Sequence, residues 1–267
     1  MTAQLQQFPL DEEYKKTSIT PDDIAGLRRW LETQPHLPSK YITDLDLILA
    51  FHSCECSTGV TKQVVDLHFT LRTLFTTYFK DRKLDARLEK CLEILSVLMV
   101  LDLWQYKEGT WPGFILLVDF EGVNLGHVAR IDIQNVQQFL YYLQEAMLVK
   151  LKGLYFINAP SFIDKVLMLM KPFMKKELMD IFHIYTPGAA ALAAVVPLAA
   201  LPKESGGEYK SFLEIKDDVK AMIRAGESYL KNENLKRVTE SLRPGKPKTM
   251  SDIFGGVLGS FKKLDID

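Results

Sequence analysis

A short, almost wholly apolar segment constrains the fold of this chain more than any other feature. Residues 114–120 have the sequence FILLVDF, with a turn-rich EGTWPG before them and Gly122 after them. A run this short and this apolar is typical of a strand that is covered on both faces. A second such run, LYFIN at residues 154–158, follows one stretch of helical periodicity. Because strand, helix and strand in this order form a parallel pair with a right-handed crossover, we predict an α/β fold.

Helical patterns account for most of the remaining chain. Thr20 is a suitable N-cap, and Pro21 a suitable first residue, for a helix over residues 20–34. Apolar residues at helical spacing predict six more helices, at residues 44–54, 60–79, 86–104, 133–148, 161–182 and 214–231. Pro172 lies in the middle of one of them and should kink or interrupt it.

These patterns divide the chain into three parts. We expect an all-helical domain at residues 1–80 and an α/β domain with a mostly parallel sheet at residues 81–240. Residues 241–267 contain glycine, lysine and proline, and this composition predicts an irregular tail laid over the surface.

Charge and cysteine content exclude several classes of function. The chain has 33 basic and 34 acidic residues, whereas nucleic-acid binding requires a net basic footprint. Its three cysteines fit a reducing compartment better than a disulfide framework. The first residues show no signal-peptide pattern, and the longest apolar run, 189–201, is too short to span a bilayer. We therefore expect a cytoplasmic protein that does not bind nucleic acid.

An acid and a histidine follow the first predicted strand. Asp119, Glu121 and His127 would lie at the carboxyl edge of the sheet, where ligands often bind. They could form an acid/base site, or they could cap a turn. No nucleophile elbow, phosphate loop or dinucleotide fingerprint accompanies them. We favour the structural interpretation and expect neither a catalytic residue nor a cofactor.

Two other groups of residues resemble a metal site and a phosphate-binding loop, but their spacing does not fit either one. His52, Cys54 and Cys56, with His68 further along, contain metal-binding side chains, but neighbours two apart in a helix point away from each other. Gly245 and Lys246 lack the upstream glycine and the strand of a phosphate loop. We predict no metal site and an exposed tail.

The segment 161–182 has a broad apolar face with several methionines. It could be an ordinary core helix that covers the sheet. It could also be a mobile lid over a lipid pocket, whose wall adaptable methionines would suit.

Three ordered blocks now point to a family. GFILLVDFEGVNLGHVARI, KLKGLYFINAPSFIDKVLMLMKPF and LPKESGGEY resemble the CRAL-TRIO lipid-binding family. The tail RPGKPKTMSDIFGGVLGSFKKLDID and the leader segments LRRWLETQPHLP and HFTLRTLF are similar to its insect branch. That branch is akin to α-tocopherol transfer protein and cellular retinaldehyde-binding protein, and the likeness covers nearly the whole chain.

The resemblance implies a carrier without enzymatic activity. Its sheet would be the floor of a closed apolar cavity, and the helix after the second strand would be the gate. Asp119 and Glu121 would then be turn residues. The implied ligand-binding residues are Phe114, Val118, Leu125, Phe139, Tyr142, Leu143, Met147, Leu154, Phe162, Ile163, Val166, Leu167 and Met170.

This sequence departs from the family in three ways. It lacks a stretch before residue 88 that normally includes a first strand, so one edge of the cavity should be more open. AFHSCE stands in place of an arginine-rich motif, and the gate has Glu177, Met179 and Ile181 where basic residues are usual. The loss of the basic residues of the gate argues against phosphoinositide-triggered release. We expect only weak headgroup or membrane contacts, from Lys150, Lys152, Lys175 and Lys176.

We therefore predict a carrier that binds a small hydrophobic molecule, such as a retinoid, tocopherol or carotenoid, and transfers it between membranes. Contact with the membrane surface would be transient. One rival is a ligand-sensing adaptor that does not transfer its ligand. A second is a hydrolase of lipid esters that uses His127 with an acid.

Overall fold

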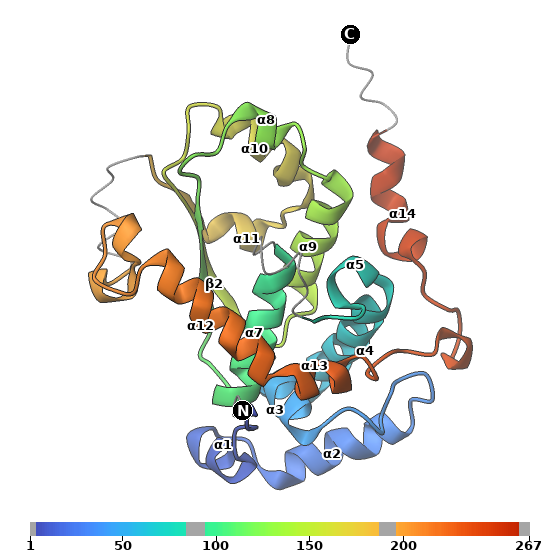
Figure 1. The fold of residues 1–267 in the computed structure, drawn as a ribbon. Coiled ribbons are helices and arrows are strands. Elements are labelled where there is room, and N and C mark those ends of the chain that lie inside the picture. The colour runs from blue at the N-terminus through green and yellow to red at the C-terminus, as the bar shows by residue number, and fades with distance from the viewer. Residues whose placement is uncertain (1–3, 84–93, 187–195, 262–267) are drawn as a thin grey trace.

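The computed structural model describes residues 4–83, 94–186 and 196–261, except for the side chains of 94–96 and 256–261. A set of helices at one end of the molecule adjoins an α/β region with a small sheet (Figure 1). This agrees with the predicted α/β class and its helical N-terminal part.

The N-terminal region consists of α1 to α5. Thr20 and Thr43 each cap a helix, because each threonine accepts an N–H from an aspartate three residues on, whose carboxylate accepts the threonine N–H in return. Leu31, Leu47 and Ile48 are fully buried in the core between these helices. The helices are α1 (Leu10–Lys16), α2 (Pro21–Glu32), α3 (Asp44–Ser53), α4 (Thr58–Leu74) and α5 (Thr76–Phe79).

The sheet has three parallel strands in the order β1-β2-β3 in the described ranges. β1 (Phe114–Asp119) and β2 (Leu151–Ile157) are the two predicted strands, and β1 forms one edge of the sheet. β3 (Phe182–Ile184) was not predicted, because three residues are too few to show a period. In the register, Leu116 pairs with Leu154, and Leu154 pairs with Phe182.

Helices before and after β1 and β2 complete the α/β region. The predicted helix over 86–104 is seen as α7 (Ile94–Glu108), while its first part lies outside the described residues. α8 (Leu125–Val128) is a single turn, and α9 (Ile133–Glu145) connects β1 to β2.

The prediction of one helix over 161–182 was wrong, although the interruption at Pro172 is confirmed. The segment forms α10 (Ile163–Met170), the short helix η1 (Lys171–Phe173) and α11 (Lys176–Asp180). Proline lacks an N–H and clashes with the preceding turn, so the α-helical ladder stops there.

The C-terminal part crosses back over the molecule. The predicted helix over 214–231 is divided at Gly226 into α12 (Phe212–Ala225) and α13 (Glu227–Glu233). The short helices η3 (Leu198–Ala200), η4 (Lys203–Ser205) and η5 (Glu240–Leu242) complete the chain path.

The prediction of an irregular tail was wrong for its middle part, which forms α14 (Met250–Phe261). Thr249 and Asp252 cap this helix: the Asp252 carboxylate accepts the Thr249 N–H at 2.9 Å, and the Thr249 hydroxyl accepts the Asp252 N–H at 3.3 Å. This cap and the buried Phe254 outweigh the low helix propensity of the glycines in the segment.

Candidate lipid-binding site

An apolar cluster fills the space between the sheet and the helices α9, α10 and α11. Its buried members come from all of these elements, so no single helix or strand creates it. They are Leu140 and Leu143 of α9, Leu154 and Phe156 of β2, Leu167 of α10 and Leu178 of α11. The cluster is the part of the described chain that best matches the predicted ligand site.

Most of the predicted ligand-binding residues meet in this cluster. Alternation along the strands and the helical period of α9 and α10 direct their side chains to the same side of the sheet. The predicted residues that pack there are Phe114, Val118, Phe139, Leu143, Met147, Leu154, Ile163, Leu167 and Met170.

The other four predicted residues lie elsewhere or at the margin. Val166 is buried on α10, and Phe162 is half-buried at the start of that helix. Leu125 of α8 is 49% exposed. Tyr142 belongs to a different cluster, on the side of α9 that packs against α4 and α5.

The expected gate helix, α10, is anchored by one face. Val166 and Leu167 are buried, whereas the next residue, Met168, is 69% exposed. η1 begins directly after Met170, so the helix has a structural break at its carboxyl end. α10 therefore presents an apolar side chain to the outside while its other face covers the cluster.

A groove of about 470 Å³ opens between the N-terminal helices and the α/β region. Five residues belong both to the groove and to the apolar cluster, so the groove leads toward the cluster: Leu143, Met147, Leu151, Leu178 and Ile181. Its other lining residues are Ser53, Cys54, Val60, Val64, Gln144, Glu145, Val149, Lys150, Lys175 and Glu177.

The two lysines of this groove already have acidic partners. Lys150 pairs with Glu55, and hydrogen bonding from Lys150 lowers the pKa of that carboxyl. Lys175 lies 2.5 Å from Glu145, whose carboxylate raises the pKa of the lysine. Lys152 and Lys176 are exposed, and neither of them lines the groove. The rim of the groove is therefore close to neutral.

The candidate acid/base residues have separate structural tasks. Asp119 Oδ1 accepts the N–H of Glu121 and the side-chain amide of Asn158, each at 2.9 Å. His127 Nδ1 accepts the N–H of Asn124 at 3.2 Å and thereby caps α8. These bonds support the interpretation of both as turn residues.

The candidate metal ligands are also dispersed. Cys54 is half-buried, Cys56 is exposed, and both are free thiols. The Nδ1–H of buried His68 donates to the carbonyl of Ala146 at 2.6 Å. In the described ranges, no three side chains of histidine, cysteine, aspartate or glutamate are grouped so that they could hold a metal ion.

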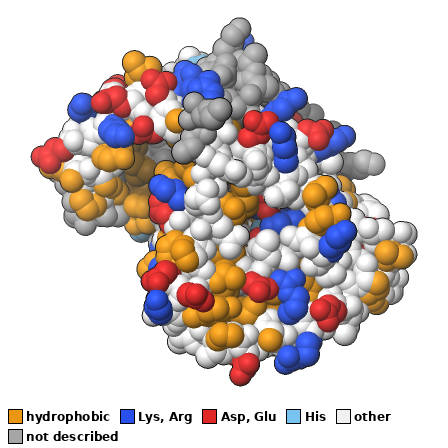
Figure 2. All heavy atoms as spheres, turned by 60° about the horizontal axis from the view of Figure 1, so that its bottom comes forward, with side chains coloured by type: hydrophobic (Ala, Val, Ile, Leu, Met, Phe, Trp, Pro, Cys, Tyr) orange, Lys and Arg blue, Asp and Glu red, His pale blue; other side chains and the backbone are white. Residues whose placement is uncertain are grey.

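The surface gives two further observations. Basic and acidic side chains are interspersed on the face shown in Figure 2, with apolar patches between them. No helix in the described part of the chain is both long enough and apolar enough to cross a bilayer.

The fold and the cluster define the class: a helical domain joined to an α/β domain whose small parallel sheet has an apolar interior on one face. A family model described as CRAL/TRIO domain matches residues 74–207, half of the chain, and one described as Pinta-like, UBA domain matches residues 16–88. The chain therefore belongs to the CRAL/TRIO domain family. Its placing in an insect branch stays a prediction.

Several curated proteins are similar to this chain. An α-tocopherol transfer protein-like protein of Homo sapiens is 24% identical over 214 residues, which are 73% of this chain and 61% of the relative. That of Mus musculus is 25% identical over the same length. Clavesin-1 of Rattus norvegicus is 24% identical over 95 residues, 36% of this chain and 27% of the relative. The chain thus spans about 61% of the length of the first of these relatives.

Among solved structures, the crystal structure of Sfh5 superposes with a TM-score of 0.41 at 13% identity. The superposition covers 92% of this chain and 99% of Sfh5.

Proposed function

We propose that this protein is a carrier that binds a small hydrophobic molecule between its sheet and α10 and transfers it between membranes. Membership of the CRAL/TRIO family and likeness to proteins named for tocopherol transfer support the proposal. The observation that carries it is the apolar cluster shared by the sheet, α9, α10 and α11. A retinoid, a tocopherol or a carotenoid would suit such a site.

Burial of the ligand supplies the binding energy. Apolar surface removed from water contributes about 25 cal/mol per Å². A ligand that buries about 400 Å² would gain on the order of 10 kcal/mol before the entropy costs of binding. No covalent step is involved, and the carrier releases the ligand unchanged.

Release requires movement of α10, because packed side chains close the cluster. The break at η1 gives this helix a place to pivot, and exposed Met168 can enter the outer part of a bilayer. α10 would open where its lipid-facing side chain is stabilised by the membrane. Contact with the membrane would therefore promote release.

Phosphoinositides have no prominent part in this mechanism. The groove lysines are paired with Glu55 and Glu145, and two partly neutralised ammonium groups bind a multiply charged phosphate weakly. Transfer to acceptor vesicles with and without phosphoinositide should differ by less than about twofold. A tenfold acceleration would contradict this part of the proposal.

Two neighbouring residues of α10 provide the decisive test. Leu167→Trp fills the cluster and should weaken binding of a fluorescent retinoid by at least about tenfold, since overpacking costs about 1–3 kcal/mol. Met168→Trp is the matched control, because its side chain faces outward and should leave affinity unchanged. Equal effects of the two substitutions would place the ligand elsewhere.

The protein purified from its source provides a second test. Mass spectrometry of an organic extract should show one hydrophobic species in near-stoichiometric amount. A protein that is empty, and that also takes up no retinoid, tocopherol or fluorescent phospholipid, would instead be an adaptor without cargo.

A further inference from the structure

The chain from the end of α13 to the first residues of α14 is tied to the N-terminal helices. We call this segment, residues 234–254, the strap. Lys236 Nζ lies 2.6 Å from Asp46 Oδ2 of α3. The N–H of Val238 donates to Thr73 Oγ1, and the N–H of Thr239 donates to the carbonyl of His36, each at 2.9 Å. Both the side chains and the backbone of the strap therefore hold it to the helical domain.

Asp66 of α4 is the main fastening point. Its two oxygens accept from Arg243 Nη1 at 2.7 and 2.9 Å, and Lys248 Nζ lies 2.9 Å from Oδ2. His36 Nε2 approaches Oδ1 at 2.9 Å. Two basic residues of the strap thus converge on one carboxylate, and their side chains are 6% and 34% exposed.

The end of the strap reaches the wall of the candidate site. Phe254 of α14 is buried and stacks on Phe75 with ring centroids 5.8 Å apart. Its ring also meets Tyr141 of α9 edge-on at 5.3 Å. The neighbouring positions Leu140 and Leu143 of α9 belong to the apolar cluster. α9 therefore has the candidate ligand site on one side and the strap on the other.

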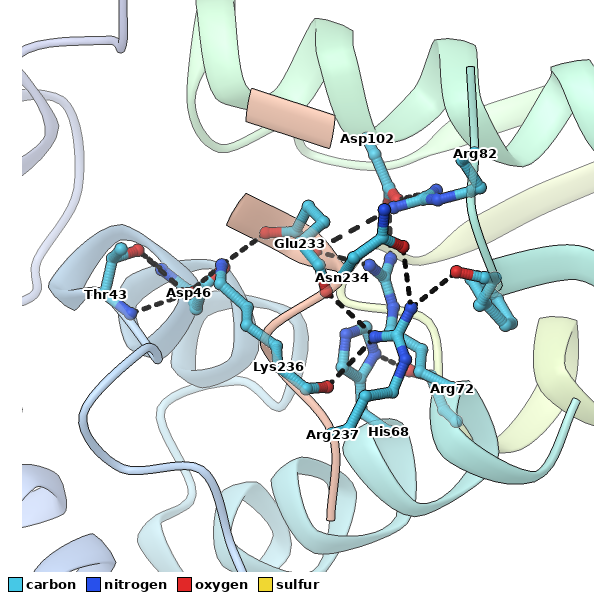
Figure 3. Close-up of polar contacts among 12 residues, drawn as sticks. Thr43, Asp46, His68, Arg72, Arg82, Asp102, Glu233, Asn234, Lys236 and Arg237 are labelled. Atoms are coloured by element: carbon cyan, nitrogen blue, oxygen red, sulfur yellow. Dashed lines mark hydrogen bonds and ion pairs between the residues drawn. The ribbon is translucent and has the colours of Figure 1, made fainter. Parts of the chain in front are cut away.

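The same side of α9 is connected through Tyr142 to a buried ionic network, whose residues Arg72 and Glu233 are labelled in Figure 3. Arg72 Nε donates to Tyr142 Oη at 3.0 Å, while its Nη1 lies 2.7 Å from Glu233 Oε2. Glu233 ends α13, immediately before the strap, and pairs with Lys236. The start of the strap is thus joined to α9 through one arginine, and its end through one phenylalanine.

We propose that the strap clamps α9 and thereby sets how long a ligand is retained. This inference rests on the proposed carrier function and assigns the control of release to a second element, remote from α10. When the strap loosens, α9 loses its outer support, and the apolar wall formed by Leu140 and Leu143 can move. Because coupling between two sites is reciprocal, a bound ligand must in turn stabilise the fastened strap.

Hydrogen exchange of the unmodified protein tests the reciprocal effect. The amides of Val238 and Thr239 are bonded to the helical domain and have no part in the apolar cluster. Saturating retinol or α-tocopherol should slow their exchange by about tenfold or more, which corresponds to about 1.4 kcal/mol. Unchanged exchange with a ligand bound would overturn the clamp.

Dissociation rates test the forward effect. Phe254→Ala removes the contact with α9 and should raise the ligand dissociation rate by about tenfold. Leu242→Ala is the matched control, since Leu242 lies in the same strap and is 53% exposed. Arg243→Gln loosens the fastening at Asp66 without touching α9 and should act in the same direction as Phe254→Ala.

The outcomes separate the two proposals. Equal dissociation rates for the wild type, Phe254→Ala and Arg243→Gln would overturn the clamp and leave the carrier function intact. If the wild type binds none of retinol, α-tocopherol or fluorescent phospholipid, the carrier function is wrong and the clamp falls with it.

Discussion

Asp102→Asn should be among the most destabilising single substitutions in this protein. The Asp102 carboxylate lies between two arginines, with Arg72 Nη2 at 2.6 Å and Arg82 Nη1 also at 2.6 Å. All three side chains are largely buried, and Figure 3 shows them in the network below α7. Asparagine has nearly the same shape, so the substitution removes a charge and leaves little empty space.

Two independent arguments give the size of the effect. Burial alone would raise the pKa of Asp102, but the charges of Arg72 and Arg82 outweigh it and lower the pKa from 3.8 to about 2. A shift of this size corresponds to about 2 kcal/mol. Removing one partner of a buried ion pair lowers the stability of other proteins by about 3–5 kcal/mol. We expect a loss of about 3 kcal/mol in the free energy of unfolding.

The contacts that Arg82 keeps in the Asp102→Asn variant explain why the loss of unfolding free energy is not smaller. Without Asp102, its nearest carboxylate is that of Glu233 at 3.9 Å, and Glu233 is already paired with Arg72 and Lys236. Burial and the charges of Arg72 and Arg82 already lower the pKa of nearby Arg237 to about 10. The variant would therefore leave an excess of positive charge in a buried region.

Urea unfolding monitored by circular dichroism measures the difference, and Asp218→Asn is the control. Asp218 pairs with Lys210 at 2.5 Å but is 55% exposed, so its loss should cost less than about 0.5 kcal/mol. If both variants lose the same free energy, or if Asp102→Asn loses less than about 1 kcal/mol, the assigned role of the network is wrong.

Three further predictions concern stability. Glu13→Ala should cost about 2–3 kcal/mol in thermal unfolding, because the buried N–H and hydroxyl of Thr110 both lose their acceptor. Burial alone would raise the pKa of Asp66, but the hydrogen bonds from its basic partners have the larger effect and lower the pKa from 3.8 to about 2. Its contribution should be complete above pH 3.8 and lost as the pH falls toward 2, so Asp66→Asn should flatten the stability profile measured over this range. Gly226→Ala would place a Cβ 2.2 Å from Leu103 Cδ2 and should lower the melting temperature by several degrees, whereas Gly59→Ala has open space and should not.

The sequence was sufficient for those parts of the fold that depend on local pattern. The runs at residues 114–120 and 154–158 are too short and too apolar for exposed helices, and they overlap the two main strands, Phe114–Asp119 and Leu151–Ile157. Thr20 caps the first predicted helix as expected. Pro172 interrupts its segment because proline cannot continue the backbone ladder.

Contacts between distant segments could not be predicted in this way. Arg72 and Glu233 are 161 positions apart, and nothing in the sequence around either residue indicates the other. The groove is another example, since Val64 and Ile181 both line it although they lie far apart in the sequence. Helix α14 was missed because its glycines disfavour a helix, whereas Phe254 is stabilised by partners on α9 and near α5.

Tyr142 shows what a family resemblance leaves open about a single side chain. The resemblance implied that Tyr142, beside Leu143, borders the ligand site. However, one residue corresponds to about 100° of helix rotation, which is enough to turn Tyr142 away from Leu143. Its hydroxyl instead accepts from Arg72 Nε at 3.0 Å and lies 3.3 Å from Nδ1 of His68.

Tyr142→Phe therefore separates a role in stability from a role in ligand binding. The variant keeps the ring but leaves a buried, charged N–H without its acceptor, which should cost about 1.5–3 kcal/mol in the free energy of unfolding. Ligand affinity should change by less than about twofold, because the ring packs outside the apolar cluster and the contact of Phe254 with Tyr141 still holds α9 to the strap. Leu143→Ala, one residue further along the same helix, should weaken binding at least about tenfold. If Tyr142→Phe weakens binding tenfold and leaves unfolding unchanged, the phenol reaches the ligand, and α9 does not separate the ligand site from the ionic network.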